Sequence, residues 1–334
     1  MLKPFLTTGI GSLPHLNALE ASRLILDTFD IPFWPQLPAL SFREFMVPQY
    51  SEGLPFLKID TGKEAIWIER NGSDELERFY EGWTEESRVA ISEDFAKGLH
   101  TFLEVIKYRR FNILKGHVTG PLTFSLGLKD NSGKAVYFDE EFRELSLMIL
   151  KAKTRWQLDQ LKQHAEEVII FIDEPILSAL GSSSYLGVSE AEASRLLKEL
   201  IDVIKGEGGI SGIHCCGNAN WPLVIDCRPD IINFDAYDYA DTLALYPAEF
   251  KAFLERGGCL AWGAVPTSDA IAGENPESIR SRFQKGVEQL SVHIPGDLIF
   301  SNLLLTPSCG TGSRTIEETL KIFQLLMRLK EEYV

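Results

Sequence analysis

The sequence predicts an α/β fold, and specifically a single (β/α)8 TIM barrel domain that spans residues 1–334. Eight short apolar runs alternate along the chain with longer segments of helical periodicity, which is the order of elements in α/β proteins. The runs are nearly continuously apolar, as expected for parallel strands buried on both faces of a sheet. The length also suits such a barrel, which usually has about 250 residues and often carries insertions. An open doubly wound sheet is the structural alternative.

The predicted strands are short runs bounded by polar or turn-forming residues. In chain order they cover residues 5–10, 31–36, 112–118, 167–173, 212–216, 230–235, 259–265 and 297–302. The segments between them have apolar residues three and four positions apart. In residues 92–110, for example, Phe95, Leu99, Phe102 and Ile106 fall on one helical face. Helices are therefore expected between the strands, where they cover the sheet.

Residues 50–90 interrupt this alternation. Asn71 and Gly72 stand between two strand-like runs, and Asn-Gly is a strong signal for the two-residue turn of a β-hairpin. We expect an inserted hairpin near the mouth of the barrel, with its turn at these two residues. The chain has no low-complexity linker and no internal repeat that would indicate a second domain.

Composition narrows the class of protein. The net charge of −15 opposes binding to nucleic acid or to an anionic membrane. No apolar stretch approaches the roughly 20 residues of a membrane helix, and the N-terminus lacks the apolar core of a signal peptide. We therefore expect a cytoplasmic protein. Five cysteines at sparse spacing fit free thiols better than a disulfide framework.

Reactive residues stand at the ends of the predicted strands, where a barrel has its catalytic groups. They follow or end the first, third, fourth, fifth, sixth and eighth strands: Ser12, Thr119, Asp173, His214 with Cys216, Asp235 and Cys309. This concentration at one end of the barrel is the main indication of an active site. His117, close to the end of the third strand, is either a core histidine or a catalytic residue of this site.

The segment "GIHCCGN" (212–218) suggests a metal site. Alternation along a strand directs His214 and Cys216 to one face and Cys215 to the other, where it packs against the helices. Zinc takes nitrogen and sulfur ligands in tetrahedral geometry, and Cys309 and Asp235 are positioned to complete the set. The two remaining cysteines, at residues 227 and 259, belong to the opposite end of the barrel.

Six short motifs, in order, give the chain a family resemblance. "TTGIGSLP", "GHVTGPLTF", "IDEP", "HCCGN", "DIINFD" and "SCGTGSRT" resemble the C-terminal catalytic barrel of cobalamin-independent methionine synthase. That barrel belongs to a superfamily that also contains uroporphyrinogen decarboxylase and corrinoid-dependent methyltransferases to coenzyme M. The resemblance extends over essentially the whole chain.

The resemblance implies a zinc-dependent methyltransferase that forms methionine from homocysteine. It implies that His214, Cys216 and Cys309 are zinc ligands, and that Asp235 stands where the family has a glutamate ligand. It also implies a subsite for the amino acid part of homocysteine, formed by Ile10, Gly11, Ser12, Glu44 and Asp173. Coordination to zinc would deprotonate the substrate thiol, which makes it the nucleophile.

The methyl donor and the acceptor are open at this point. Two-barrel methionine synthases have a further N-terminal barrel that helps to bind polyglutamyl folate, and this chain has no room for one. We therefore favour a methylated corrinoid protein, or methylcobalamin, as the donor. The alternatives are methyl transfer to coenzyme M or another small thiol, a decarboxylase without metal, and a purely structural zinc site.

Overall fold

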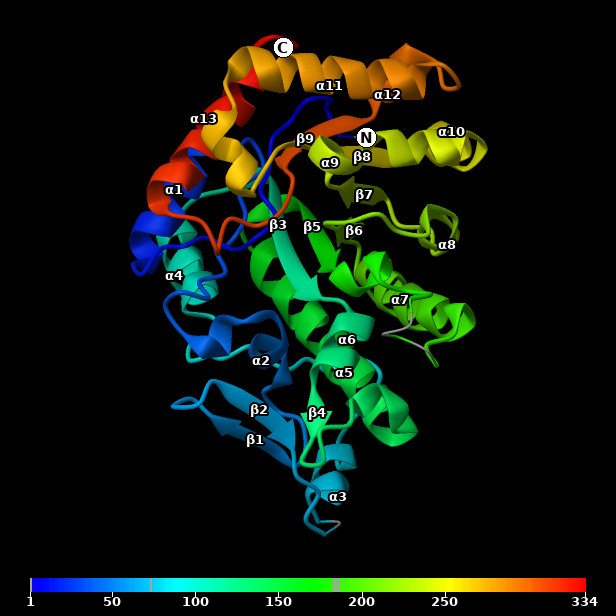
Figure 1. Cartoon of the computed structure of the whole chain (residues 1–334). Helices are drawn as coiled ribbons and strands as arrows, with labels where there is room; N and C mark the ends of the chain where they lie inside the picture. The colour runs from blue at the N-terminus through cyan, green and yellow to red at the C-terminus, as the bar shows by residue number, and fades with distance from the viewer. Residues whose placement is uncertain (1, 73, 183–184, 186) are drawn as a thin grey trace.

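The computed structural model describes residues 2–72, 74–182, 185 and 187–334. Its centre is a curled sheet of six parallel strands with helices packed around the outside (Figure 1). The strands lie side by side in chain order, without the reversal that is typical of an open doubly wound sheet. They are β3 (Phe111–Thr119), β5 (Ala165–Asp173), β6 (Ile210–Cys215), β7 (Ile231–Phe234), β8 (Cys259–Val265) and β9 (Leu303–Pro307).

Two irregular segments, residues 5–13 and 31–36, lie between β9 and β3. Thr7 forms an isolated parallel bridge with Leu305 of β9, and Phe33 forms another with β3. Backbone hydrogen bonds also join the two segments to each other. Hydrogen bonding therefore continues from β9 through both segments to β3.

The first two predicted strands, 5–10 and 31–36, are thus only isolated bridges and not regular strands. Pro32 and Pro35 have no N–H group, so the second segment cannot form a complete ladder. In the first segment, Phe5 has a φ of 61°, which takes its backbone out of the extended conformation.

The predicted eighth strand is also wrong in position. Residues 297–302 belong to helix α12 (Gly296–Ser301), and the strand is β9, which begins immediately after them at Leu303. The apolar run extends through both elements, and periodicity in so short a run does not separate a buried helix from a buried strand. The segment after the strand keeps its predicted location at the sheet edge.

Most of the longer helices begin at polar caps or prolines, as their sequences favour. Asn17, Asp139 and Thr315 cap α1, α6 and α13 through their side chains, which accept hydrogen bonds from the first turn. The helices are α1 (Ala18–Thr28), α2 (Met46–Ser51), α3 (Asp74–Tyr80), α4 (Lys97–Ile106), α5 (Pro121–Gly127), α6 (Glu140–Lys162), α7 (Glu190–Gly206), α8 (Trp221–Asp226), α9 (Ala236–Tyr239), α10 (Pro247–Glu255), α11 (Pro276–Ser291), α12 and α13 (Ile316–Glu331). Short 3₁₀ helices cover Phe42–Glu44, Val136–Phe138, Pro175–Ser178, Ala240–Leu245 and Asp269–Gly273. In the part of the chain described here, no helix is long and apolar enough to cross a membrane.

The insertion in residues 50–90 does contain a hairpin, but its turn is not where we predicted it. Strands β1 (Leu57–Asp60) and β2 (Ala65–Ile68) pair antiparallel around a turn at residues 61–64. Asn71 and Gly72 follow the hairpin and precede α3. The two-residue strand β4 (Lys129–Asp130) adds to β2 in parallel, so the insertion forms a small separate sheet (Figure 1).

Buried apolar side chains form two cores on opposite faces of the curled sheet. The larger core lies between the sheet and the surrounding helices. The smaller one fills the inside of the curl and contains Ile10, Ile31, Ile169, Phe171, Ile231, Cys259, Ala261 and Leu304. The inner core ends below the carboxyl ends of the strands, where polar side chains replace apolar ones.

Candidate active site

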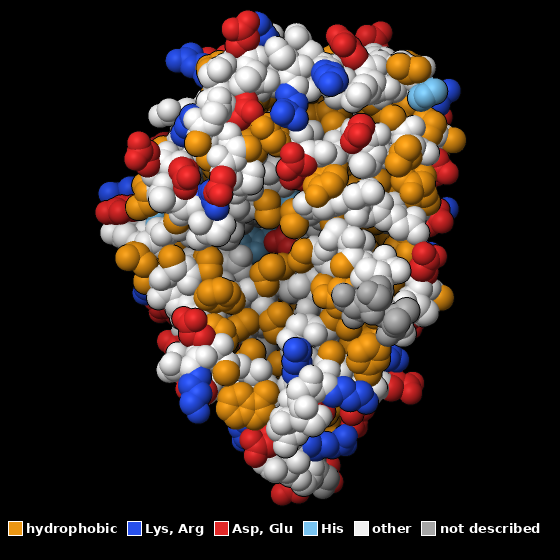
Figure 2. Space-filling model, viewed as in Figure 1, with side chains coloured by type: hydrophobic (Ala, Val, Ile, Leu, Met, Phe, Trp, Pro, Cys, Tyr) orange, Lys and Arg blue, Asp and Glu red, His pale blue; other side chains and the backbone are white. Residues whose placement is uncertain are grey.

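A cavity of about 530 Å³ opens at the carboxyl ends of the strands. In Figure 2 it is the hollow at the centre of the face, with histidine and acidic side chains at its floor and hydrophobic side chains around it. The lining residues come from strand ends and from the irregular segments: Ile10, Ser12, Gln36, Pro38, Ala39, Glu44, Phe45, Met46, Asp173, Pro175, His214, Cys216, Cys309, Gly310, Gly312 and Ser313. We call residues 10–12 the first wall and residues 44–46 the second wall.

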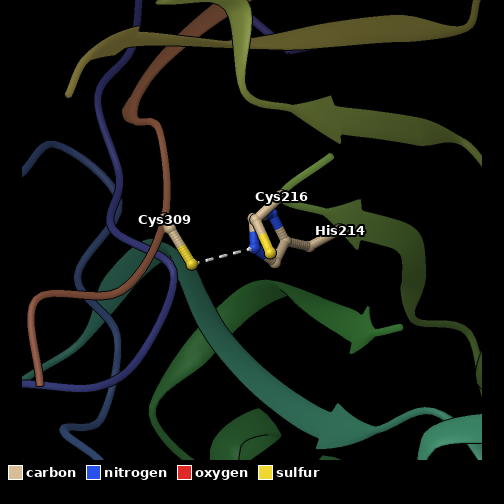
Figure 3. Close-up of side chains that lie close together, drawn as sticks. All are labelled: His214, Cys216 and Cys309. Atoms are coloured by element: carbon tan, nitrogen blue, oxygen red, sulfur yellow. Dashed lines mark hydrogen bonds between the residues drawn. The ribbon is translucent and has the colours of Figure 1, made fainter. Parts of the chain in front are cut away.

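Three potential metal ligands meet at the floor of this cavity. One ligand atom from each of His214, Cys216 and Cys309 lies within 4.8 Å of the other two. His214 comes from β6, Cys216 follows the same strand, and Cys309 reaches in from the segment after β9 (Figure 3). The distance from Cys309 Sγ to His214 Nε2 is 3.7 Å. The ligand atoms of a tetrahedral zinc site lie about 3.5 to 3.8 Å apart, so this donor set suits zinc.

The His214 ring is oriented by a chain of buried hydrogen bonds. Its Nδ1 is bonded to the side-chain oxygen of Asn233, on the neighbouring strand β7. The amide nitrogen of Asn233 in turn donates to the carbonyl of Ala261 (2.7 Å) and to the hydroxyl of Thr306 (2.8 Å). These two acceptors fix the Asn233 oxygen toward the ring, so Nδ1 carries a proton and Nε2 faces the thiols. Such outer partners are typical of histidines that bind metals.

The thiols of Cys216 and Cys309 affect each other's ionisation, so that Cys216 ionises readily and Cys309 does not. Hydrogen bonds from Cys309 and His214 lower the pKa of Cys216 to about 4, although burial opposes this. The same interaction with Cys216, together with burial, raises the pKa of Cys309 well above its usual value. The pair is thus poised to bind a cation, because a bound cation would stabilise both thiolates.

Two carboxylates face the same cavity and each has an oxygen to spare. Asp173 ends β5, and Oδ1 of its side chain has no hydrogen-bond partner among the described residues. Glu44 is fully buried, and its Oε2 accepts from Leu37 N (2.8 Å). Against the effect of burial, the backbone N–H groups of Gly98 and Lys97, at the start of α4, also lower its pKa, while its Oε1 makes no hydrogen bond of ordinary geometry in the described chain. Burial raises the pKa of Asp173 to about 6 and that of Glu44 to about 7.

The charge of the lining is therefore acidic. Among the described residues that line the cavity there is no lysine or arginine. A carboxylate that loses water on burial is stabilised by a cationic partner, and an unsatisfied oxygen is a vacant acceptor. The floor of the cavity thus suits a ligand that carries an ammonium group.

The other predicted site residues have different places. Asp235 lies outside the group of three metal-ligand candidates, and its carboxylate accepts from Asp238 N (3.1 Å) as the N-cap of α9. Burial, with a smaller contribution from Cys216, raises the pKa of Asp235 to about 6. Cys215 packs on the helix side, fully buried, as strand alternation predicts.

His117 and Gly11 contact each other and are not among the described residues that line the main cavity. The His117 ring is buried, stacks on Trp34 at 3.8 Å between centroids, and has no hydrogen bond to either nitrogen in the described structure. A Cβ on Gly11 would lie 2.9 Å from this ring, so the absence of a side chain allows the contact. Ile10 and Ser12, on either side, do line the cavity.

Sequence reasoning missed Asn233 and Lys115. Both lie inside the curled sheet, and strand alternation could have found them. Asn233 is two residues before Asp235, and Lys115 is two residues before His117. We overlooked both because each stands inside an apolar strand and not at its end.

Among known proteins, similarity to this chain is found at the level of solved structures. No family model matches the chain, and no curated protein does. The structure of a B12-independent methionine synthase from Shewanella sp. W3-18-1, in complex with selenomethionine, matches with a TM-score of 0.63 and 15% identity, over 98% of this chain and 97% of that one. An endoglucanase from Ruminococcus champanellensis gives a TM-score of 0.43 and 11% identity, over 93% of this chain and 98% of that one. The likeness to the methionine synthase structure is one of fold.

Proposed function

We propose that the chain is a zinc-dependent methyltransferase that moves a methyl group to the thiol of homocysteine. The observation that carries this proposal is a single cavity with two chemistries, one nitrogen and two sulfur ligands beside two buried carboxylates. The proposal includes a (β/α)8 barrel in one domain, in which residues 5–13 and 31–36 take the places of the first two strands. The fold shared with a B12-independent methionine synthase supports it.

His214, Cys216 and Cys309 would hold the zinc ion, and the fourth position would receive the substrate sulfur. Asp235 would have to leave the N-terminus of α9 to take that position, so we assign it to the cap and not to the metal. Bound zinc would act as a Lewis acid that lowers the pKa of the substrate thiol and fixes its position. Asn233 would keep His214 in the tautomer with Nε2 free.

Asp173 and Glu44 would bind the substrate ammonium through the carboxylate oxygens that lack protein partners. This pairing would restore to both groups the interactions they lose on burial. It would also aim the sulfur at the metal, an orientation effect that can contribute several kcal/mol to catalysis. In the reaction the thiol loses its proton, a sulfur–carbon bond forms, and the bond between methyl and donor breaks.

For the donor we propose a methylated corrinoid protein or methylcobalamin. A small amino acid fills only part of a cavity of about 530 Å³, and the remaining lining is largely apolar, with Pro38, Ala39, Phe45, Met46 and Pro175. A polyglutamyl folate has several negative charges, for which the described lining offers no lysine or arginine. The same lack of cations argues against coenzyme M, which ends in a sulfonate, and against a porphyrinogen with several carboxylates.

The decisive experiment combines metal analysis with acceptor comparison. We expect one zinc per chain, and methylation of L-homocysteine but not of coenzyme M with methylcobalamin as donor. X-ray absorption should detect a new zinc–sulfur bond when homocysteine is added, whereas a structural zinc would give an unchanged spectrum. Full activity after removal of zinc by a chelator would refute the mechanism, and preference for coenzyme M would refute the acceptor.

A further inference from the structure

Strand β3 contributes no residue to the cavity lining within the described chain, yet its inward side chains contact both walls. The direction of these side chains follows from Gly116, where an added Cβ would fall 1.9 Å from Gln157 of α6. Residue 116 therefore faces the helices, and Lys115, His117 and Thr119 face the inside. This face is polar from Lys115 onward, whereas Ile113, earlier on the same face, packs against the inner apolar core.

Lys115 holds the first wall from below. Its ammonium is fully buried and donates to the carbonyl of Ile10 at 2.5 Å. The nitrogen also lies 4.4 Å from the centre of the Phe171 ring and 5.5 Å from that of Phe33, which favours a cation in this place. Burial lowers the pKa of this lysine to about 7, although the negative charge of Asp173 opposes the shift.

The next two inward residues, His117 and Thr119, also contact the walls of the cavity. His117 packs against Gly11, the middle residue of the first wall. The hydroxyl of Thr119 donates to the carbonyl of Met46, in the second wall, at 2.7 Å. One strand is thus in contact with both segments that face the proposed amino acid subsite.

We propose that β3 is a positioning strand, in which Lys115 and Thr119 set the two walls at the separation that the ammonium end of the substrate requires. Both side chains act by holding the backbone of a wall in place. Ile10 to Ser12 lie in a segment without a regular ladder, so the buried hydrogen bond from Lys115 to Ile10 O adds to the few backbone hydrogen bonds that fix Gly11 and Ser12. The inference rests on the proposed function, since the amino acid subsite is part of it.

The chain supplies a matched control for Lys115. Lys153 of α6 is also fully buried and also donates to a backbone carbonyl, that of Ala90 at 3.2 Å. Burial lowers the pKa of this lysine as well, to about 8. Lys153 contacts neither wall in the hydrogen bonds of the described chain. Each lysine also faces one carboxylate, Asp173 for Lys115 and Glu52 (3.7 Å) for Lys153. Lys115→Met and Lys153→Met therefore remove the same group from comparable surroundings, and only the first should disturb the subsite.

We expect Lys115→Met to raise KM for L-homocysteine by about tenfold, the effect of losing a charged hydrogen bond. The kcat value at saturation should stay within about threefold, because the metal ligands are untouched. Zinc content should remain one per chain. Lys153→Met should lower the melting temperature and leave KM within about twofold. A Lys115→Met protein with unchanged KM, or an equal rise in both variants, would overturn the proposal.

Thr119 gives a second test that does not depend on removing a charge. Thr119→Val keeps the shape and loses the hydroxyl, so KM should rise by about three- to fivefold. Thr119→Ser keeps the donor and should restore the wild-type value. If the valine and serine variants have the same KM, Thr119 has only a packing role and this part of the proposal fails.

Hydrogen exchange separates this inference from the proposed function. In the first wall, Leu13 N donates to Gln36 O (2.9 Å) and Gln36 N donates to Gly11 O (3.0 Å). Lys115→Met should accelerate amide exchange in residues 9–16, and Lys153→Met should not. This measurement needs no substrate. If the wild type fails to methylate homocysteine, the function is wrong, and exchange alone then decides whether Lys115 positions the wall; equal exchange in wild type and Lys115→Met would refute it.

Discussion

The two sides of the cavity are built in different ways. On the metal side, His214 and Asn233 stand on regular strands, and the ladder between β6 and β7 fixes their backbone. On the wall side, Ile10 to Ser12 and Glu44 stand on segments without a regular ladder, held by a few backbone hydrogen bonds and by side-chain hydrogen bonds from β3. The comparison teaches that regular strands fix His214 together with its partner Asn233, whereas a subsite on irregular backbone needs support from other elements.

The largest expected effect lies on the metal side. Cys309→Ala should abolish stoichiometric zinc binding and lower kcat/KM by about 10³-fold or more, because one of three ligands is lost. Metal analysis and initial rates measure this. Cys215→Ala is the control, since Cys215 lies on the opposite face of the strand and packs in the outer core. Retention of zinc and activity in Cys309→Ala would mean that the metal side is not the active one.

Asn233 tests how far the metal side depends on its own support. Asn233→Ala removes the acceptor for His214 Nδ1, and we expect zinc affinity to fall by about 10- to 100-fold. Competition with a chromophoric chelator gives the affinity. Thr306→Val, which removes only one of the two acceptors behind Asn233, should have a smaller effect. An unchanged affinity in Asn233→Ala would show that the ring is fixed by packing.

Glu44 tests the wall side directly. Glu44→Gln should raise KM for L-homocysteine by about tenfold, because a neutral amide attracts an ammonium less than a carboxylate does. 4-Mercaptobutyrate, which is homocysteine without its ammonium group, provides the internal comparison. Its rate should be low with wild type and nearly the same with the variant. A parallel loss for both thiols would indicate a structural change and not a lost contact.

The smallest expected effect is a dependence of the wall side on pH. Since burial raises the pKa of Glu44 to about 7, KM for homocysteine should rise about threefold from roughly pH 7.5 to roughly pH 6.5. Steady-state kinetics over this range, in wild type and in Glu44→Gln, measures it. The variant should lose the part of the pH dependence that Glu44 causes.

The Glu44 carboxyl group also makes the free energy of unfolding depend on pH. The folded protein binds the Glu44 proton more tightly than the unfolded chain does, since the ordinary pKa is 4.5 and the folded value is about 7. The free energy of unfolding therefore falls as the pH rises from the ordinary pKa of 4.5 to the folded value of about 7. We expect the free energy of unfolding of the wild type to decrease by about 1 to 3 kcal/mol more than that of Glu44→Gln over this range. Denaturant titrations at several pH values would check this.

The comparison also explains what the sequence could and could not predict. Alternation along β6 was sufficient to separate His214 and Cys216 from Cys215, because a strand has a fixed period of two. The resemblance, and not periodicity, pointed to Glu44, which stands in a 3₁₀ turn without a regular pattern. Positions that depend on irregular backbone were the least predictable, as the two missing strands and the hairpin turn illustrate.

Pairing across long sequence distance limited the prediction in another way. The boundary between α12 and β9 is invisible in an apolar run, since it depends on which residues meet β8. The sequence gives no reason for Lys115 in a buried strand, because its acceptor, the carbonyl of Ile10, lies 105 residues earlier. Such long-range contacts form only in the folded chain, so local sequence does not reveal them.

The contact between two segments that lie far apart in the sequence has a consequence for biosynthesis. Thr311 N donates to Ser12 O at 2.8 Å and Gly312 N donates to the Ser12 hydroxyl, so the segment that bears Cys309 also supports the first wall. A ribosome delivers Ser12 long before Cys309, and domains fold as they emerge. During translation the nascent chain would therefore have neither a complete set of metal ligands nor a finished wall. Capture of the metal would then be a late event, and a truncated product that lacks the last strand would be inert and not partly active.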